Sequence, residues 1–361
     1  MTDAHTYHRK RKKYRLASLL LHTSLLIYLS LMSGEPLLGM VKALALQDFW
    51  QRGLFLVLFY LLAQFLLWPI RYLSNWKLEK DFGMLKQNFA GWLKDTFITH
   101  ALGILFFTAS ALVFFSVLRA WPEQWWWLLA IIAFAFSAFT STVFPVLILP
   151  LFYQCVPLNE PNLVPRLQKT LEICGLPKLP LFEIRMGKKT VRANAMLTGF
   201  GKTRRALLSD TLLTQYEPTE IEMVLAHEAG HDRRRHLMRS LIFEAGTASI
   251  SFYVLFRFSQ GVDLLSLEFF PTLVLAVHLA GLTLLPLANS LSRLHETEAD
   301  NFALERYPDI AVFSSLMEKL AQNNLSDPSP SGLEEFFLYT HPSKKNRIAH
   351  ARNILRMRLA N

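Results

Sequence analysis

The sequence has 361 residues, 52% of them hydrophobic and 18% charged, with 28 Phe and 8 Trp and a positive mean hydropathy. This composition excludes an ordinary chain of two or three soluble domains and indicates a membrane protein. In such a protein, a net charge of +10 indicates membrane orientation and attraction to anionic lipid, so we expect no nucleic-acid partner.

Uncharged stretches of membrane length recur along the chain. About 20 apolar residues are needed to cross a bilayer, and the uncharged run between Glu123 and Glu160 is the clearest example. The fifth predicted span is the weakest because it contains Glu244, and the alternative for it is an amphipathic helix at the membrane surface. The pattern predicts six spans, at residues 16–32, 53–70, 98–118, 125–151, 241–258 and 269–291.

Lys and Arg gather at one set of span ends. The N-terminal run HRKRKKYR and the segments 71–97 and 152–240 are rich in them, whereas the loop SQGVDLLSLE has none. Since cytoplasmic loops carry the excess of basic residues, we expect the N-terminus and both segments to be cytoplasmic. No small-residue cleavage site follows the first apolar stretch convincingly, so we expect it to remain as an anchor. Cys155 and Cys174 then lie on the cytoplasmic side, where a structural disulfide is not expected.

The chain therefore divides into two predicted regions. Residues 1–151 form a membrane region with four spans. Residues 152–361 contain a hydrophilic insert, two further spans at 241–258 and 269–291, and a cytoplasmic tail.

A metal-binding pattern lies in the insert, where residues 220–237 are predicted to form a helix. His227 and His231 are four residues apart, so their imidazoles share one helix face and can ligate one ion. Glu228 is adjacent and can reach a water at that ion. Neutral imidazoles hold the metal, while the carboxylate takes the proton from the attacking water. Because this short motif also occurs by chance, a third ligand is needed to decide.

The candidate third ligand lies in SRLHETEADNFA. Glu296 and Asp300 are one helical turn apart, so one carboxylate can ligate zinc while the second hydrogen-bonds a ligand histidine and fixes its tautomer. If Glu298 were the ligand, it would not lie one helical turn from Asp300. We therefore expect Glu296 to be the ligand and Glu298 to face away from both Glu296 and Asp300. A solvated acidic helix face is the alternative.

Membrane topology provides an independent check on this ligand set. If one ion binds all three residues, an even number of crossings must separate His231 from Glu296. The uncharged run at 269–292 demands one crossing, so the fifth span is expected to be real.

Several motifs occur in an order that resembles one family. They are KDFGMLKQNFAGWLKD, LPLFYQCVPLNEPNL, NAMLTGFGKTRRALLSDTLL, HEAGHDRRRH, SRLHETEADNFA and HPSKKNRI. Together they resemble the integral-membrane zinc metallopeptidases of the CAAX prenyl protease type I group, the sterile-twenty-four class. The resemblance covers most of the chain. It implies a multi-pass α-helical membrane protein of about six transmembrane helices with a cytoplasmic, gluzincin-like α+β metallopeptidase domain.

Carried onto this chain, the resemblance implies one zinc ion bound by His227, His231 and Glu296. It makes Glu228 the general base and implies that Asp300 hydrogen-bonds one of the ligand histidines without contacting the ion.

The resemblance also assigns residues outside the metal motifs. Asn194 and Ala195 match a pair on the edge strand beside the cleft, where main-chain groups pair with an extended substrate. ANAMLT and RRALLS flank GFGKT, a pattern typical of a hairpin, which without the family could be purely structural. His341 and Arg347 match donors that stabilise an oxyanion; without the family they would be a turn residue and a solvated charge. Only packing or solvation is expected of His236, His278, His295 and His350.

Two departures from the family bear on the predicted function. Eukaryotic relatives have seven spans around an intramembrane chamber, whereas six are predicted here, and no retention signal ends the chain, so a bacterial inner membrane is expected. The resemblance implies prenylated C-terminal CAAX peptides as substrates, with other membrane-associated or misfolded peptides as the second possibility. A catalytically silent membrane binder would need a fourth protein ligand to close the zinc site, and a transporter would need paired broken half-helices.

Overall fold

Six helices of membrane length form the larger part of the molecule. The computed structural model describes residues 2–199, 203–327 and 330–360. In this described part, six helical segments are long and apolar enough to cross a membrane, which confirms the predicted six spans, the fifth included. The helices are α1 (Thr2–Leu31), α3 (Asp48–Arg71), α5 (Phe89–Ala120), α6 (Trp125–Val143), α11 (His236–Phe258) and α12 (Phe270–Arg306).

Two of these helices continue through a widened turn into a short helix. α3 passes through the π-helical turn η1 (Tyr72–Lys77) into α4 (Leu78–Asp81), and α6 passes through η2 (Phe144–Ile148) into α7 (Leu149–Phe152). A proline lies near each junction, and prolines and π-turns are the usual causes of helix bends. The long fourth span therefore continues as a helix through its prolines, with a π-helical turn at Pro145.

Aromatic side chains join the membrane helices at the end that lies far from the sheet. Phe270 at the start of α12 meets Phe59 of α3 with ring centroids 5.4 Å apart, and Phe115 of α5 at 5.8 Å. Gly34, which precedes the short helix α2 (Glu35–Lys42), has a φ of +69°, and a Cβ there would lie 3.3 Å from Pro271. Glycine is suited to this turn because it adopts positive φ without strain.

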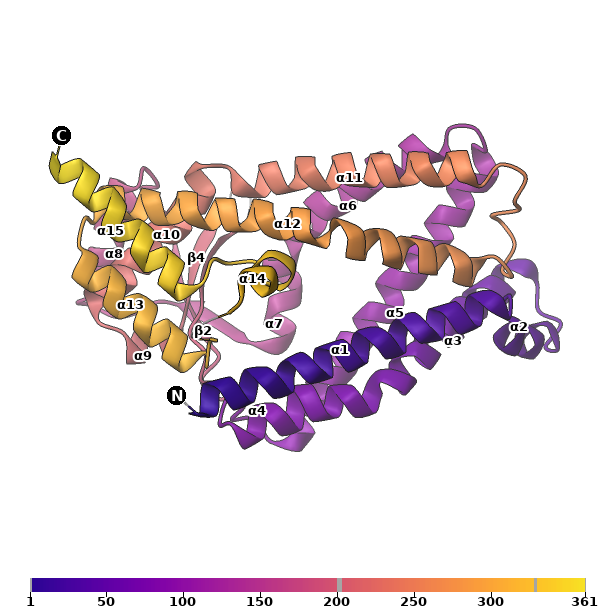
Figure 1. Ribbon diagram of the computed structural model, residues 1–361, viewed down its shortest axis with the longest axis horizontal. Coiled ribbons are helices and arrows are strands. Elements are labelled where there is room, and N and C mark those ends of the chain that lie inside the picture. Colours follow the sequence, from indigo (N-terminus) through magenta and orange to yellow (C-terminus); the bar gives the residue numbers. More distant parts are fainter. Residues whose placement is uncertain (1, 200–202, 328–329, 361) are drawn as a thin grey trace.

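The sheet and the shorter helices gather at the other end of the molecule, where both termini also lie (Figure 1). The sheet has the order β1-β2-β4-β3, so β3 is an edge strand. β2 and β4 are parallel, and the two outer pairs are antiparallel. The strands are β1 (Gln154–Pro157), β2 (Leu181–Arg185), β3 (Ala195–Thr198) and β4 (Arg205–Ser209).

The predicted hairpin is present as β3 and β4. Ala195 lies opposite Leu208, and Thr198 lies opposite Arg205. Residues 200–202 of the predicted loop GFGKT lie outside the described residues. Asn194 lies just before β3. Its main-chain oxygen accepts a hydrogen bond from the Ser209 main-chain N–H, and its main-chain N–H donates to the Ser209 hydroxyl. The contact between the two segments therefore continues one residue beyond β3.

The helix α10 (Pro218–Arg233) packs between the sheet and α12. Its apolar side chains, including Ile221, Leu225 and Ala226, are buried with Leu208 of β4 and Phe302 of α12. Burial of side chains of this kind supplies the main stabilising free energy of such a core. The remaining helices are α8 (Val164–Ile173), α9 (Asp210–Gln215), α13 (Ile310–Asn323), α14 (Gly332–Leu338) and α15 (Lys344–Ala360).

The predicted helix 220–237 is wrong at its C-terminal end. α10 ends at Arg233, Arg235 has a φ of 55°, and α11 begins at His236. A residue in the left-handed region ends an α-helix, so the chain changes direction here. α11 then runs away from the sheet and α12 returns to it (Figure 1), an arrangement that agrees with the two crossings required by the predicted ligand set.

Candidate metal centre

The metal centre forms where α10 and α12 cross closely. A Cβ on Gly230 would lie 3.0 Å from the Ala299 Cα and 3.1 Å from the Phe302 Cβ. Glycine at this position therefore lets the two helix backbones approach each other. Ala299 lies between Glu296 and Asp300 in sequence, so the crossing brings both carboxylates to the histidine face of α10.

The three predicted ligands meet at one point. The Nε2 atoms of His227 and His231 are 3.2 Å apart. Glu296 Oε2 lies 3.5 Å from His227 Nε2, and Glu296 Oε1 lies 3.3 Å from His231 Nε2. Each residue thus offers one ligand atom, and these atoms all lie within 4.8 Å of one another.

This donor set fits a zinc ion. Ligand atoms bound ~2.0–2.1 Å from a tetrahedral ion lie about 3.4 Å from one another, close to the separations seen here. Two imidazole nitrogens and one carboxylate are also a ligand type that catalytic zinc sites use. In the described part of the chain the candidate group has three members, so a four-coordinate ion held there would keep one position for water or substrate.

Asp300 contacts the predicted ligand His227. Its Oδ1 lies 2.9 Å from His227 Nδ1, which leaves Nε2 of that ring facing the other ligands. Asp300 is 2% exposed, so its charge needs a partner. Arg347 at the start of α15 provides it, donating Nε at 2.7 Å and Nη2 at 2.6 Å. Burial lowers the pKa of Arg347, but Asp300 reverses this and raises it.

His341 contacts the third predicted ligand. Its Nδ1 lies 2.9 Å from Glu296 Oε2, and its side chain is exposed. Together with Arg347 it lines the cavity of about 160 Å³ that contains the metal ligands, hereafter the metal cavity. The structure therefore brings His341 and Arg347 to the centre from a segment more than forty residues beyond Glu296 in sequence.

Glu228 lines the same metal cavity, and no hydrogen bond or ion pair joins its carboxyl group to another described residue. Burial raises the pKa of Glu228 above the ordinary carboxyl value, while the nearby His227 and His231 act in the opposite direction. A bound cation would act in the same direction as the histidines. The carboxyl group is thus open to a small molecule in the cavity.

The edge strand borders the metal cavity. Asn194 and Ala195 line it together with His227 and Glu228. Among the strands that the structure describes, β3 has a neighbour only on its β4 side, so its outer main-chain groups face away from the sheet, where an extended peptide could pair with them.

Two further residues support the centre and were not predicted to do so. His236 Nδ1 lies 2.9 Å from His231 Nδ1, and His236 Nε2 lies 2.9 Å from Glu298 Oε2. Glu298 faces away from the ligand atoms, as expected, but it holds His236, which in turn holds His231. His236 is buried and stacks on His295 at 4.2 Å. The sequence signal was the first histidine after HEAGH, but only the fold pairs it with Glu298.

The other histidines lie apart from the ligands. His350 Nε2 contacts the Asn301 amide oxygen at 2.9 Å, and His278 Nε2 contacts the Thr23 hydroxyl at 2.9 Å.

Comparison with known families accounts for both halves of the chain. Residues 157–355 match the model of Peptidase family M48, and residues 1–154 match the model described as CAAX prenyl protease N-terminal, five membrane helices. The described part of that N-terminal half has four membrane-length helices. The fold and the metal centre thus define an integral membrane metalloprotease. The chain belongs to peptidase family M48, and it is a multi-pass membrane zinc protease.

Curated relatives and a solved structure agree with this assignment. The chain is 28% identical to the uncharacterized metalloprotease YhfN of Bacillus subtilis, over 77% of this chain and 68% of the relative. It is 28% identical to CAAX prenyl protease 1 of Saccharomyces cerevisiae, over 78% and 67%. It is 30% identical to the CAAX prenyl protease 1 homolog of Arabidopsis thaliana, over 78% and 68%. The crystal structure of S. mikatae Ste24p shares the fold, with a TM-score of 0.84 at 24% identity over 96% of this chain and 87% of that chain.

Proposed function

We propose that this protein is a gluzincin-type zinc endopeptidase that cleaves peptide bonds at the cytoplasmic face of the membrane. In this proposal His227, His231 and Glu296 hold one zinc ion per chain. The observation that carries this proposal is that the three ligand atoms lie within 4.8 Å of one another. The carboxyl group of Glu228 lines the same cavity and forms no hydrogen bond or ion pair with another described residue. A bound zinc ion would supply a Lewis acid that lowers the pKa of water and polarises a carbonyl group.

Glu228 acts as the general base. Its carboxylate accepts a proton from the attacking water and then gives it to the leaving amine nitrogen, which is the usual pair of tasks for a carboxylate at this position. Its place next to the ligand His227 and in the metal cavity supports this role.

Asp300 and His341 assist from either side of the ligands. Asp300 keeps the proton of His227 on Nδ1, so that Nε2 is free for the ion. His341 is placed to donate a hydrogen bond to the oxyanion that forms as the carbonyl is attacked. Arg347 holds Asp300 with two nitrogens and adds positive charge to the same cavity.

Asn194 and Ala195 align the substrate. A peptide added as a further strand to the outer side of β3 would pair with main-chain groups and pass the metal ligands along the metal cavity. Such pairing depends little on side chains and therefore accepts many sequences.

We place the N-terminus and the metal centre in the cytoplasm. The N-terminal run HRKRKKYR supports this, because basic residues favour the cytoplasmic side, and the N-terminus lies at the same end of the molecule as α10 (Figure 1). We also propose a boundary between a membrane region, residues 1–151, and a peptidase region, residues 152–361, which includes the spans 241–258 and 269–291. A bacterial inner membrane is the proposed location, and one of the relatives that the chain resembles, YhfN, is bacterial.

We propose prenylated C-terminal CAAX peptides as the substrates. The names of the yeast and plant relatives support this choice. Cleavage of other membrane-associated or misfolded peptides is the alternative. A silent binder with structural zinc is disfavoured, because a structural site is closed by a fourth protein ligand and the described group has three.

The test is mass-spectrometric mapping of cleavage of matched farnesylated and unprenylated CAAX peptides by purified protein in detergent. The Glu228→Ala variant is compared with Glu222→Gln, which changes a carboxylate of the same helix that pairs with Arg166 instead. We expect cleavage near the C-terminus of the farnesylated peptide only, lost in Glu228→Ala with zinc retained, and intact in Glu222→Gln. Equal cleavage of both peptides would contradict the proposed specificity for prenylated substrates. Cleavage by Glu228→Ala would contradict the proposed role of Glu228 as the general base.

A further inference from the structure

A second and larger cavity adjoins the metal cavity. Its volume is about 580 Å³, which lies within the usual range of ligand sites. His341, Arg347, Met317 and Leu320 line both cavities. A peptide held at the metal ligands can therefore continue from one cavity into the other.

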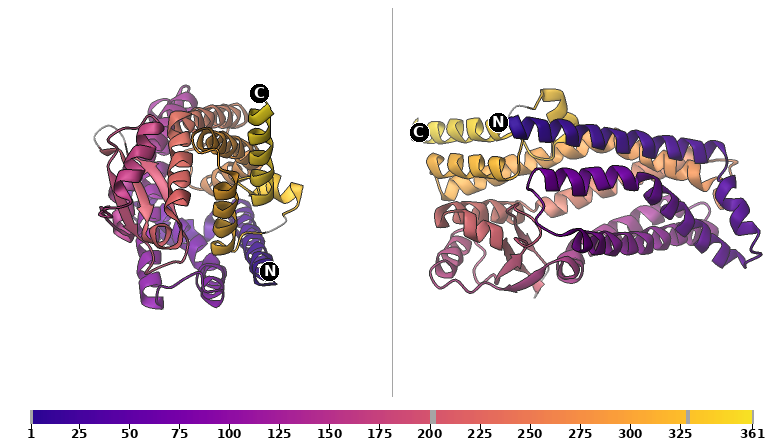
Figure 2. Two further views of the ribbon diagram at one scale, coloured as in Figure 1. Left: turned by 90° about the vertical axis from the view of Figure 1, so that its left-hand side faces the viewer. Right: turned by 90° about the horizontal axis from the view of Figure 1, so that it is seen from below.

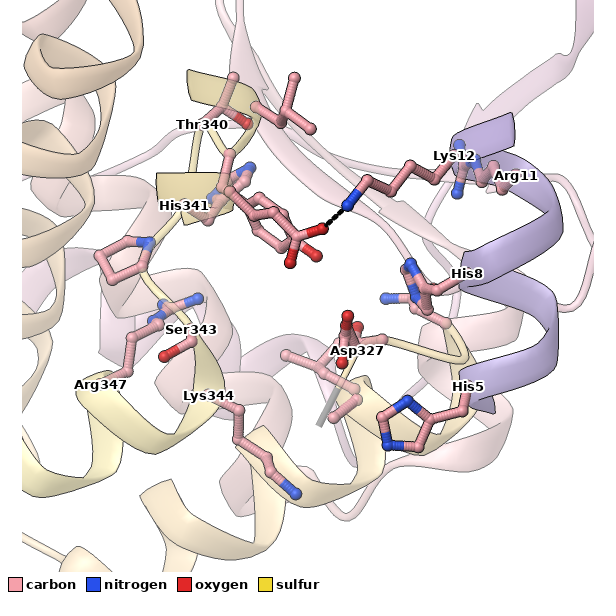
Figure 3. Close-up of a pocket in the computed structure, with 18 of the residues that line it drawn as sticks. His5, His8, Arg11, Lys12, Asp327, Thr340, His341, Ser343, Lys344 and Arg347 are labelled. Carbon is pink, nitrogen blue, oxygen red and sulfur yellow. Dashed lines mark hydrogen bonds and ion pairs between the residues drawn. The ribbon is translucent and has the colours of Figure 1, made fainter. Parts of the chain in front are cut away.

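Positive charge dominates this second cavity, hereafter the basic cavity. Figure 3 shows it between the N-terminal part of α1 and the segment that carries His341 and Lys344. Its carboxylates are Asp327 and Glu334, and Glu334 is paired with Lys12 across the cavity. Its cationic side chains are Arg9, Arg11, Lys12, Arg15, Lys344 and Arg347.

Three of these cationic side chains form no hydrogen bond or ion pair with the described residues. Arg347 is bound to Asp300, Lys12 to Glu334, and Arg11 to the Tyr7 hydroxyl. Among the residues that the structure describes, no hydrogen bond or ion pair is recorded for Arg9, Arg15 or Lys344. Their charges are thus available to a ligand.

The basic face of α1 is held in place rather than loose. Tyr7 is fully buried and donates to Glu79 of α4 at 2.6 Å. Arg192, two residues before Asn194, donates to both Tyr7 (2.9 Å) and Glu79 (2.8 Å). His8 contacts the Leu325 carbonyl oxygen, and α1 begins beside the C-terminal helices (Figure 2). Positions 8, 11, 12 and 15 share one helix face and all line the basic cavity.

We propose that the basic cavity binds the C-terminal carboxylate of the peptide substrate, through Arg9, Arg15 and Lys344. This inference rests on the proposed function and adds what selects the cleavage position. Arginine and lysine recognise carboxylates by charge-assisted hydrogen bonds. Three extended residues span at most about 10–11 Å. If the C-terminal carboxylate of a peptide is bound next to the metal cavity, the peptide bond at the metal ligands lies a few residues before that C-terminus.

The experiment compares a farnesylated CAAX peptide that ends in a free carboxylate with the same peptide ending in a carboxamide. kcat/KM is measured for wild type in detergent, for the triple variant Arg9→Gln, Arg15→Gln, Lys344→Gln, and for a control triple variant. The control is Lys10→Gln, Lys13→Gln, Lys345→Gln, which removes the same charge from the same two helices at positions that do not line the basic cavity. It also controls for folding and membrane orientation.

Wild type is expected to prefer the carboxylate peptide by about tenfold or more, as charge-assisted hydrogen bonds imply. The cavity variant should lose this preference because its kcat/KM falls for the carboxylate peptide alone, and the control should keep it. Equal cleavage of the two peptides by wild type would overturn the inference and leave the peptidase standing. Absence of all cleavage would overturn the proposed function with it.

A membrane ligand is the competing outcome. If the cavity variant cleaves both peptides like wild type in detergent, but is impaired in vesicles that contain phosphatidylglycerol, the basic cavity binds lipid head groups and the inference is wrong.

Discussion

Arg347 grips both carboxylate oxygens of Asp300, with Nε 2.7 Å from Oδ2 and Nη2 2.6 Å from Oδ1. Asp300 in turn holds His227 at 2.9 Å. The first turn of α15 is thereby connected, through one buried carboxylate, to a proposed metal ligand on α10. The C-terminal segment is thus joined to the candidate metal centre by hydrogen bonds.

Replacing Arg347 by Lys should weaken zinc binding. Lysine cannot reproduce the two parallel hydrogen bonds, and loss of a residue that orients a metal ligand typically lowers metal affinity about 10- to 100-fold. The zinc dissociation constant would be measured by competition with a chelator. Arg352→Lys, an exposed position on the same helix, is the control. Unchanged zinc affinity in Arg347→Lys would contradict the connection through Asp300.

Glu298→Gln should also lower zinc affinity, although Glu298 contacts no ligand atom of the trio. Its carboxylate holds His236, and His236 holds His231, so the neutral amide loses a charge-assisted hydrogen bond and frees the orientation of the His231 ring. We expect about a tenfold loss of zinc affinity. Glu305→Gln, at the surface end of α12, serves as the matched change, and an equal effect there would show that the loss is not specific to the His236 contact.

Gly230→Ala should force α10 and α12 apart. The added Cβ would lie 3.0 Å from the backbone of Ala299, and overpacking of this kind costs about 1–3 kcal/mol. Thermal unfolding in detergent should begin at a lower temperature, and zinc should be retained less well. At Gly246 in α11 an added Cβ would meet nothing within 4 Å, so Gly246→Ala should leave both measurements near wild type.

Acid should weaken the peptidase region through Glu220, which caps α10. Burial by itself would raise the pKa of Glu220, but Lys319, the Glu217 amide and Ser315 outweigh it and lower the pKa. Because the folded pKa lies below the unfolded value of about 4.3, the stabilisation is complete above that pH and is lost as pH falls through the folded pKa. Between pH 6 and pH 3 the thermal unfolding temperature should therefore fall more steeply with decreasing pH for wild type than for Glu220→Gln.

The two cysteines offer a test of orientation. Cys174 is 2% exposed and burial raises its pKa to about 11, so it should react slowly with maleimide. Cys155 is half-buried, and burial raises the pKa of its thiol as well, but its side chain is more accessible than that of Cys174. A membrane-impermeant maleimide should therefore label Cys155 faster than Cys174, and only from the cytoplasmic side of the membrane. Cys155→Ser identifies the labelled site, and labelling from the other side would reverse the proposed topology.

The sequence by itself determined the features that depend on local spacing. Membrane spans follow from the length of uncharged runs. The pairing of His227 with His231, and of the proposed ligand Glu296 with Asp300, follows from the helical repeat, which places residues four apart on one face. The hairpin that contains Ala195 followed from the turn pattern of its loop, whereas the place of this strand at the edge was implied by the family resemblance. Each of these is a short-range regularity, so the residues that reveal it are neighbours in the chain.

Only the tertiary structure decided which distant groups meet. The helix break at Arg235, the contact of His236 with Glu298, and the grip of Arg347 on Asp300 have no signature in local spacing. The basic run of α1 is typical of a cytoplasmic end, and nothing in it indicates that one face lines a cavity beside His341. These contacts arise because packing of apolar faces, such as α10 against α12, brings together segments that are far apart in the chain, and burial then requires their charged groups to pair.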